Sequence, residues 1–157
     1  MQRSSAFDCA LRVLALRDHS EAELRRKLKQ KGYDDEEAEG SMTRLRELGY
    51  LDDARFARVF AESSIRNGRG YGARLKMELA RRGVAAATVG EALAGLSEEF
   101  GDAFSEAEIL SRTMERRFSG FDPASATEKE RRRVIAYLQR KGFSLSAILA
   151  RLKIHSN

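Results

Sequence analysis

A pattern that ends in glycine occurs three times along the chain and limits it to a helical repeat fold. The copies end at Gly32, Gly83 and Gly142. In each copy aliphatic residues stand eight and four positions before the glycine, a basic residue directly precedes it and an apolar residue follows it. The aliphatic pairs are Leu24 and Leu28, Leu75 and Leu79, and Val134 and Leu138.

This pattern describes an amphipathic helix together with its C-terminal end. Aliphatic residues four apart lie on one face of a helix, where they can pack into a core. A cation in the last turn complements the negative end of the helix dipole, and glycine supplies the left-handed residue of a Schellman motif. Ser20 with Glu23, and Thr127 with Glu130, have the spacing of capping boxes that begin such helices.

Each of these helices has a second amphipathic run before it and a third after it. The earlier runs cover residues 7–16, 56–65 and 109–118. The later runs, two of which begin with the caps Asp34 and Ser144, carry apolar stripes at Ala38, Met42, Leu45 and Leu48, at Val89, Leu93 and Leu96, and at Ile148 and Leu152. We therefore predict an all-α protein of three tandem three-helix repeats, residues 4–51, 52–100 and 101–157, stacked into an elongated, curved modular array.

Composition narrows the classes of protein further. Charged residues make up 34% of the chain, but the regular apolar periodicity distinguishes it from a disordered segment. No apolar stretch has the length of a membrane span, so we expect a cytoplasmic protein without a membrane partner. Cys9 is the single cysteine and lies on an apolar stripe, which favours a buried thiol.

The sequence offers no constellation of catalytic or metal-binding residues. His19 and His155 are far apart, and neither has a second ligand at metal-binding spacing. The glycine-rich stretch 68–72 lacks the spacing of a phosphate loop, and we expect a mobile link between two helices there. Carboxylates fall at helix caps and on exposed faces. We predict a protein that is not an enzyme and needs no cofactor or metal.

Basic residues gather in the middle of the chain. Residues 54–95 hold eight basic and three acidic side chains. Arg74 and Arg81 lie on a different face from the aliphatic stripe, and arginine returns at the equivalent positions of the third repeat. The candidate partner-binding residues are Arg66, Arg69, Arg74, Lys76, Arg81, Arg82, Arg133 and Arg140. Such a surface favours an anionic partner, although an ordinary solvated face of an arginine-rich helix has the same composition.

Three segments carry a family resemblance. The run Leu-Arg-Glu-Leu-Gly-Tyr-Leu-Asp-Asp-Ala-Arg-Phe-Ala at 45–57 closely resembles the hallmark of the RecX family of bacterial recombination regulators. Residues 72–83 and 139–144 resemble that family's second and third repeats, so that the resemblance spans about residues 6–152. It implies three tandem three-helix repeats, which agrees with the periodicity.

The resemblance also implies a function. Proteins of this family bind the RecA filament on single-stranded DNA, lie in its groove and bridge neighbouring protomers. They inhibit the ATPase, strand-exchange and co-protease activities of RecA, in DNA recombination, repair and the SOS response. We accordingly expect RecA and its filament as partners, a weak direct contact with DNA, and a monomer. No individual contact residue is carried over from the family.

Two other functions fit the residues. A helix-turn-helix DNA-binding protein is also built from three-helix units, but it would have one dominant recognition helix and usually a dimer. Here the basic positions are spread over two repeats. A protein–protein scaffold without nucleic acid is the third reading.

Overall fold

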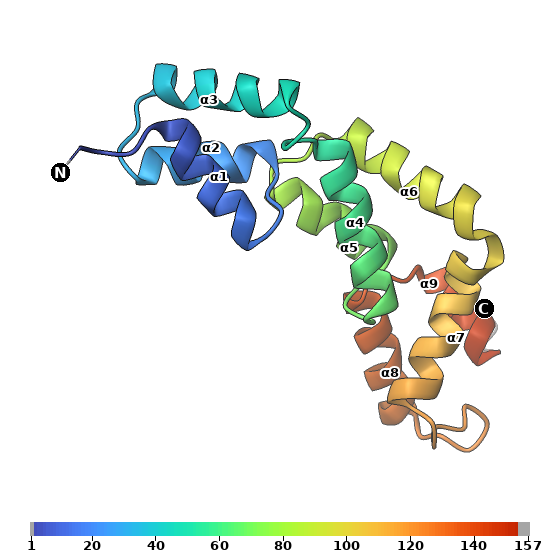
Figure 1. Ribbon diagram of the computed structural model, residues 1–157. Coiled ribbons are helices and arrows are strands. Elements are labelled where there is room, and N and C mark those ends of the chain that lie inside the picture. The colour runs from blue at the N-terminus through green and yellow to red at the C-terminus, as the bar shows by residue number, and fades with distance from the viewer. Residues whose placement is uncertain (1, 154–157) are drawn as a thin grey trace. The chain divides into compact units, whose positions relative to one another are not determined.

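The computed structural model describes residues 2–153, and within them it contains nine α-helices and no β-strand (Figure 1). The helices come in three sets of three: α1 (Ala6–Leu16), α2 (Glu21–Gln30) and α3 (Asp35–Glu47); α4 (Asp53–Arg66), α5 (Gly72–Arg81) and α6 (Ala86–Phe100); α7 (Glu106–Arg117), α8 (Glu128–Arg140) and α9 (Leu145–Leu152). A short 3-10 turn, η1 (Gly101–Phe104), precedes α7. The all-α prediction and the grouping in threes are confirmed. In this part of the chain no helix combines the length and apolarity that crossing a membrane requires.

The predicted helix starts are confirmed by their hydrogen bonds. At α2 the Ser20 hydroxyl accepts the N–H of Glu23, and the Glu23 carboxylate accepts the N–H of Ser20. Thr127 and Glu130 make the same reciprocal pair at α8. Asp34 caps α3 in the same way with Glu37, and the Ser144 hydroxyl caps α9. These contacts satisfy N–H groups that have no partner inside the helix.

The predicted helix ends are confirmed as well. Gly32 has a φ of +88°, its N–H donates to the carbonyl of Lys29, and the N–H of Tyr33 donates to the carbonyl of Leu28. Both bonds recur after α5, where Gly83 and Val84 donate, and after α8, where Gly142 and Phe143 donate. The apolar residue that follows each glycine is buried. Each end is therefore a complete Schellman motif.

The described residues form two compact units. The first holds the chain up to Val59 together with Leu79–Ala92, and the second holds Phe60–Glu78 together with the chain from Leu93 onward. Helices α4, α5 and α6 of the second repeat thus contribute residues to both units.

In the first unit, α1, α2 and α3 pack against one another around a shared core (Figure 1). Leu24, Leu28 and Met42 are fully buried there, and Cys9 is a buried thiol, as expected. One member of the predicted stripe is wrong: Leu48 is 53% exposed. It lies after the end of α3, where the chain turns toward Gly49, and so it leaves the core-facing side.

In the second unit, α9 packs against α7 and α8. The core includes Leu75 from α5, Leu96 from α6, and Leu110, Leu138 and Ile148 from the third repeat. The aliphatic positions that define the sequence repeat are therefore buried in both units.

One mode of packing joins neighbouring repeats inside each unit. In the first unit the turn after α5 lies against the start of α2: a Cβ added at Gly83 would come 2.3 Å from the Cβ of Ala22. In the second unit the turn after α8 lies against the start of α5: a Cβ added at Gly142 would come 1.8 Å from the carbonyl oxygen of Tyr71. The glycines thus end a helix and also admit the helix of the preceding repeat.

This packing corrects the expectation of a mobile link at residues 68–72. The N–H of Tyr71 donates to the carbonyl oxygen of Lys141 at 2.8 Å, and the Tyr71 ring stacks on Phe143 with centroids 5.4 Å apart. Gly72 adds a close approach, since its Cβ would lie 3.1 Å from the carbonyl oxygen of Gly142. The glycines of this stretch serve close packing between two repeats, a long-range contact that local sequence does not reveal.

Candidate functional site

Helix α8 presents two arginines to solvent on its outer side. Arg133 and Arg140 are seven positions apart and therefore lie on the same face of the helix. Val134 and Leu138 are buried on the opposite side and fix which face points outward. Neither guanidinium group makes a hydrogen bond or an ion pair with any of residues 2–153. Both guanidinium groups are thus available to an anionic partner.

Helix α5 repeats this arrangement with a difference. Arg74 and Arg81 have the same spacing, but Arg74 is half-buried and its Nε donates to Glu78 Oε1 at 2.7 Å. Lys76 and Arg81 are exposed and have no polar partner within the described part of the chain. Met77, between them in sequence, is 41% exposed. The free cations of this helix therefore accompany an apolar side chain.

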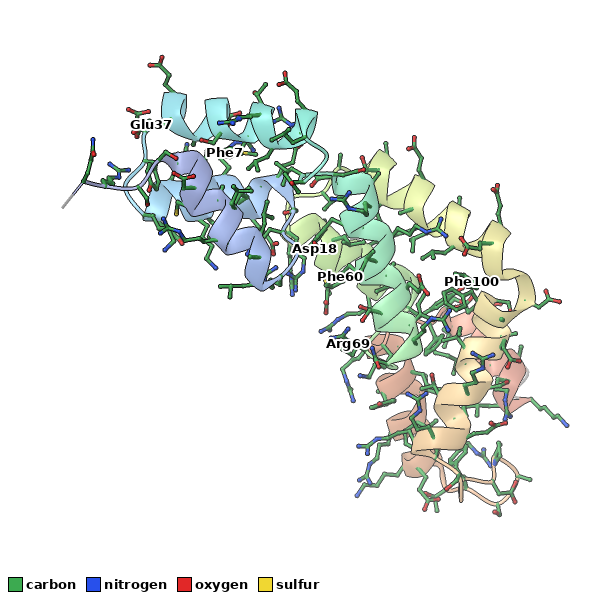
Figure 2. All side chains as sticks on the ribbon, viewed as in Figure 1. Phe7, Asp18, Glu37, Phe60, Arg69 and Phe100 are labelled. Atoms are coloured by element: carbon green, nitrogen blue, oxygen red, sulfur yellow. The ribbon has the colours of Figure 1, made fainter. Side chains whose placement is uncertain are left out.

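The turn after α4 carries the next predicted residues. Arg66 Nε donates to Glu62 Oε1 at 2.9 Å, and its guanidinium lies over the rings of Phe100 and Phe104. Arg69 lies in the turn beyond the end of α4 (Figure 2), and its Nη2 donates to the Ser63 hydroxyl at 2.7 Å. Both arginines are exposed while making these contacts.

Residues that the sequence reasoning missed adjoin this turn. A Cβ added at Gly68 would come 2.7 Å from Nη1 of Arg116, so this arginine of α7 lies directly against the turn. Lys141 is brought there by its carbonyl, which binds the Tyr71 N–H, while its Nζ lies 5.6 Å from the centroid of the Tyr137 ring. The basic residue before each repeat glycine was the available signal for Lys141; nothing in the sequence placed Arg116.

The structure thus gathers part of the predicted set in the second unit. Cations of two repeats, Arg69 and Arg74 from the second and Arg116, Arg140 and Lys141 from the third, surround the contact between residues 68–72 and the end of α8. Like-charged groups so arranged raise the local positive potential and attract anions.

Arg82 has a different environment from the other seven candidates. It belongs to the first unit, where its Nη1 donates to Glu23 Oε1 at 2.7 Å. Its carbonyl accepts a hydrogen bond from the Ser20 hydroxyl. Because Ser20 and Glu23 begin α2, Arg82 helps to hold the turn after α5 on the preceding repeat.

Glu23 caps α2, as predicted, and its carboxylate is also buried. Burial by itself raises the pKa of Glu23, but the N–H of Ser20 and the guanidinium groups of Arg17 and Arg82 outweigh it and hold the pKa below the ordinary value. Arg17 Nη1 lies 3.3 Å from Glu23 Oε2. The group therefore stays ionised between two cations.

Among residues 2–153 no three His, Cys, Asp or Glu side chains come together as they would around a metal ion. His19 is buried and its Nδ1 lies 2.9 Å from the carbonyl oxygen of Arg17, while Nε2 has no partner in the described structure. His155 lies outside the described residues.

Comparison with protein families gives a match within each of the three helix sets. Three family models match in tandem: RecX, first three-helix domain, over residues 6–45; second, over 52–93; and third, over 105–150.

Relatives in sequence and solved structures point to the same family as the family models. A protein of Syntrophotalea carbinolica named "Regulatory protein RecX" is 40% identical over 147 residues, covering 94% of this chain and 93% of the relative. One of Trichlorobacter lovleyi with the same name is 42% identical over 142 residues, covering 90% of each. The crystal structure of RecX from Lactobacillus salivarius superposes with a TM-score of 0.73 over 94% of this chain and 92% of that chain, at 16% identity, which extends the likeness of fold beyond that of sequence. With three tandem domain matches and relatives at these identities, the chain belongs to the RecX family.

Proposed function

We propose that the chain is a non-enzymatic regulator that inhibits the RecA recombinase. It would bind in the groove of the RecA filament on single-stranded DNA and suppress ATP hydrolysis, strand exchange and co-protease activity. The family membership supports a regulatory role, because the relatives are named regulatory proteins. A regulator of this kind would act as a monomer in the cytoplasm, where the recombinase binds DNA.

The observation that carries the proposal is a set of cations without internal partners. Lys76, Arg81, Arg133 and Arg140 are exposed and are not paired with any of residues 2–153. By contrast, Arg66, Arg69, Arg74 and Arg82 each have an internal partner. Exposed cations without partners contribute little to folding, and two of these four, Arg81 and Arg140, stand at equivalent positions of the second and third repeats, which supports a role in binding.

Met77 supports a protein partner in addition to phosphate. Contacts to nucleic-acid phosphates need cations only, whereas protein interfaces combine apolar side chains with arginine. An exposed methionine beside Lys76 and near Arg81 provides that combination on α5. A RecA filament on DNA contains both protein and phosphate, and the four unpaired cations would face it.

Filament binding tests the role of these cations. We expect Arg133→Gln with Arg140→Gln to weaken binding to RecA filaments on single-stranded DNA by about tenfold or more, since each lost charge-assisted contact is worth roughly 1 kcal/mol or more. Co-sedimentation or fluorescence anisotropy at fixed salt would measure the affinity.

The matched control removes the same charge elsewhere. Arg112 and Arg132 are exposed and already paired with Glu108 and Glu128. Arg112→Gln with Arg132→Gln should leave binding within about twofold, because exposed pairs of this kind contribute little. If both double variants lost the same affinity for the filament, the effect would be due to net charge alone. If Arg133→Gln with Arg140→Gln lost no affinity, these two arginines would not belong to the interface.

A further inference from the structure

An open recess lies beside the C-terminal end of α9, in the second unit. Its volume is about 520 Å³, which is within the range of about 300–1,000 Å³ that is usual for clefts that take ligands. The loop between α7 and α8, helix α8 and the end of α9 all contribute to its wall. The lining combines apolar and basic side chains, namely Pro123, Ala124, Leu152, Arg131, Arg151 and Lys153.

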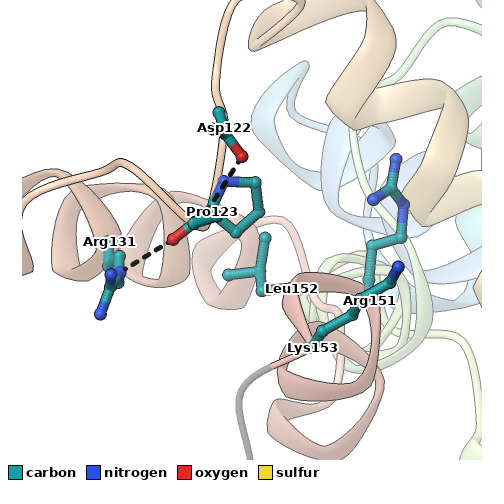
Figure 3. A pocket seen from close by; sticks show the side chains of 7 residues that line it. Asp122, Pro123, Arg131, Arg151, Leu152 and Lys153 are labelled. Carbon is teal, nitrogen blue, oxygen red and sulfur yellow. Dashed lines mark hydrogen bonds between the residues drawn. The ribbon is translucent and has the colours of Figure 1, made fainter.

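The apolar part of the recess lies between two groups of cations. Figure 3 shows Pro123 and Leu152 in the middle, with Arg131 on one side of them and Arg151 and Lys153 on the other. Leu152 is only 2% exposed and belongs to the core of the second unit, so this part of the wall is fixed by the fold. None of the lining side chains is aromatic, and a planar ring would therefore have nothing to stack on.

Hydrogen bonds hold the two arginines in place through one nitrogen each. Arg131 Nε donates to the carbonyl oxygen of Pro123 at 3.2 Å (Figure 3), and Arg151 Nε donates to the hydroxyl of Ser111 at 3.3 Å. Neither guanidinium group forms an ion pair with any of residues 2–153. Their terminal N–H groups are therefore left for a carboxylate, and little side-chain freedom is lost when one binds.

Lys153 ends α9 in a conformation that is unusual for a lysine. Its φ is +54° and its ψ is 35°, and within residues 2–153 all other positive φ angles belong to glycines. A residue with a Cβ is strained there, whereas glycine is not. The ammonium group of Lys153 has no polar partner in the described structure. A strained residue whose side chain is not used by the fold supports a role in binding.

The charge around the recess is positive. Residues 105–153 hold eleven basic and six acidic side chains. Asp122 also lines the recess, but its carboxylate accepts the N–H of Ala124 at 3.0 Å and the hydroxyl of Ser125 at 2.8 Å. Its charge is thus partly balanced by donors of its own loop. Three cations against one engaged carboxylate favour an anionic ligand.

We propose that this recess binds an extended acidic peptide segment of a partner protein. An aliphatic side chain of the peptide would lie against Pro123 and Leu152, and carboxylates on either side of it would pair with the flanking cations. A single small anion would reach one group of cations and would leave the apolar middle empty. The inference goes beyond the proposed function, because none of these three cations is among the four unpaired ones that the filament would contact.

Peptide binding to the protein alone tests the inference. A short labelled peptide with one leucine between two pairs of glutamates should bind at least about fivefold more tightly than the same peptide with serine in place of leucine, because burial of an aliphatic side chain favours binding. Replacement of the glutamates by glutamine should weaken binding as well, since the charge-assisted hydrogen bonds are lost. Fluorescence anisotropy at fixed salt measures all these affinities.

Substitutions locate the binding site on the protein. Arg151→Gln with Lys153→Gly should weaken binding of the leucine peptide by about fivefold or more, since two cations that would pair with carboxylates are removed. Lys153→Gly alone should raise the melting temperature, because it relieves the backbone strain, so that lost affinity is not a folding defect. Arg112→Gln with Arg132→Gln is the control: it removes as much charge from exposed ion pairs of the same unit and should retain the affinity.

Ala124→Glu gives a second readout, because Ala124 is exposed at the recess and glutamate adds both bulk and negative charge there. It should abolish the preference for the leucine peptide. If the wild type bound the leucine and serine peptides equally, or if both double variants lost the same affinity, net charge alone would attract the peptide and the proposal would be wrong. A loss of oligonucleotide binding without a loss of peptide binding in the Arg151 and Lys153 variant would also overturn it.

Discussion

Glu23 is a buried carboxylate of the first unit that has three polar partners. It caps α2 through the N–H of Ser20, pairs with Arg17 and Arg82, and is only 7% exposed. Sequence spacing grouped Arg82 with the binding candidates of the second repeat. Its ion pair with Glu23 instead gives it a structural role that links the first and second repeats. A buried carboxylate that loses a partner is costly, because nothing replaces the lost interaction.

Replacing Arg82 should therefore destabilise the protein more than replacing its neighbour. We expect Arg82→Met to lower the free energy of unfolding by about 1–3 kcal/mol. Arg81→Met, which removes an exposed arginine, should change it by less than about 0.5 kcal/mol. Urea denaturation of both variants at neutral pH measures the difference, and equal effects would contradict the assignment of Arg82 to the fold.

His19 makes the stability depend on pH. Burial lowers the pKa of His19 from the ordinary value of 6.5, with Arg17 and Lys27 opposing the positive charge and the Arg17 carbonyl and Glu23 favouring it. The unfolded chain then takes up a proton at a higher pH than the folded chain does. The free energy of unfolding therefore falls as the pH decreases from about 6.5 toward the lowered pKa of folded His19. Below that pKa the loss due to His19 is complete.

The test compares wild type with His19→Gln. Between pH 7.5 and pH 5.5 the free energy of unfolding of the wild type should fall more steeply, because the variant lacks the titrating imidazole. Denaturation at several pH values gives both slopes. Below about pH 4.5 Glu23 adds a further loss in both proteins, since its pKa is lowered in the fold. Parallel curves above pH 5 would show that His19 is not the group responsible.

At the scale of helices, the three repeat glycines look equivalent in sequence but differ in structure. All three have positive φ angles. A Cβ at Gly32 would meet nothing within 4 Å, whereas one at Gly142 would overlap the carbonyl oxygen of Tyr71. The first glycine is needed for its backbone conformation alone, and the last also for space.

Alanine substitutions should separate these two requirements. Gly32→Ala should lower the free energy of unfolding by about 1–2 kcal/mol, because an L-residue with a side chain is strained in the left-handed conformation. Gly142→Ala should cost about 2–5 kcal/mol, because overpacking against backbone adds to the same conformational strain. Denaturant unfolding of the two variants makes the comparison. A Gly142→Ala cost no greater than that of Gly32→Ala would mean that the α5–α8 contact yields easily.

The same contrast explains what the sequence could predict. Caps such as Ser20 with Glu23, and helix ends such as Leu28 to Tyr33, depend on residues within six positions, so local pattern was sufficient. The contacts of Gly83 with Ala22 and of Gly142 with Tyr71 join residues about 60 or 70 positions apart. For the same reason helical spacing predicted that Arg133 and Arg140 share a face of one helix, whereas it could not place Arg116 beside Gly68 or Glu23 beside Arg82.

For the whole molecule, three repeats of one plan have diverged in charge. The first repeat has Glu23 and Gln30 where the others have Arg74 with Arg81 and Arg133 with Arg140. Glu23 is used to bind Arg82 of the second repeat, whereas Arg81, Arg133 and Arg140 remain open. The unpaired arginines therefore belong to the second and third repeats, to which the proposed function assigns the surface for the filament.

The DNA-dependent ATPase activity of RecA, measured with the chain present at less than one copy per RecA protomer, tests the proposed function most directly. The account predicts that the wild type slows hydrolysis, that Arg112→Gln with Arg132→Gln slows it equally, and that Arg133→Gln with Arg140→Gln slows it much less at the same concentration. The chain alone should hydrolyse no ATP. An unchanged RecA rate at equimolar wild-type protein, or ATP hydrolysis by the chain itself, would contradict the account.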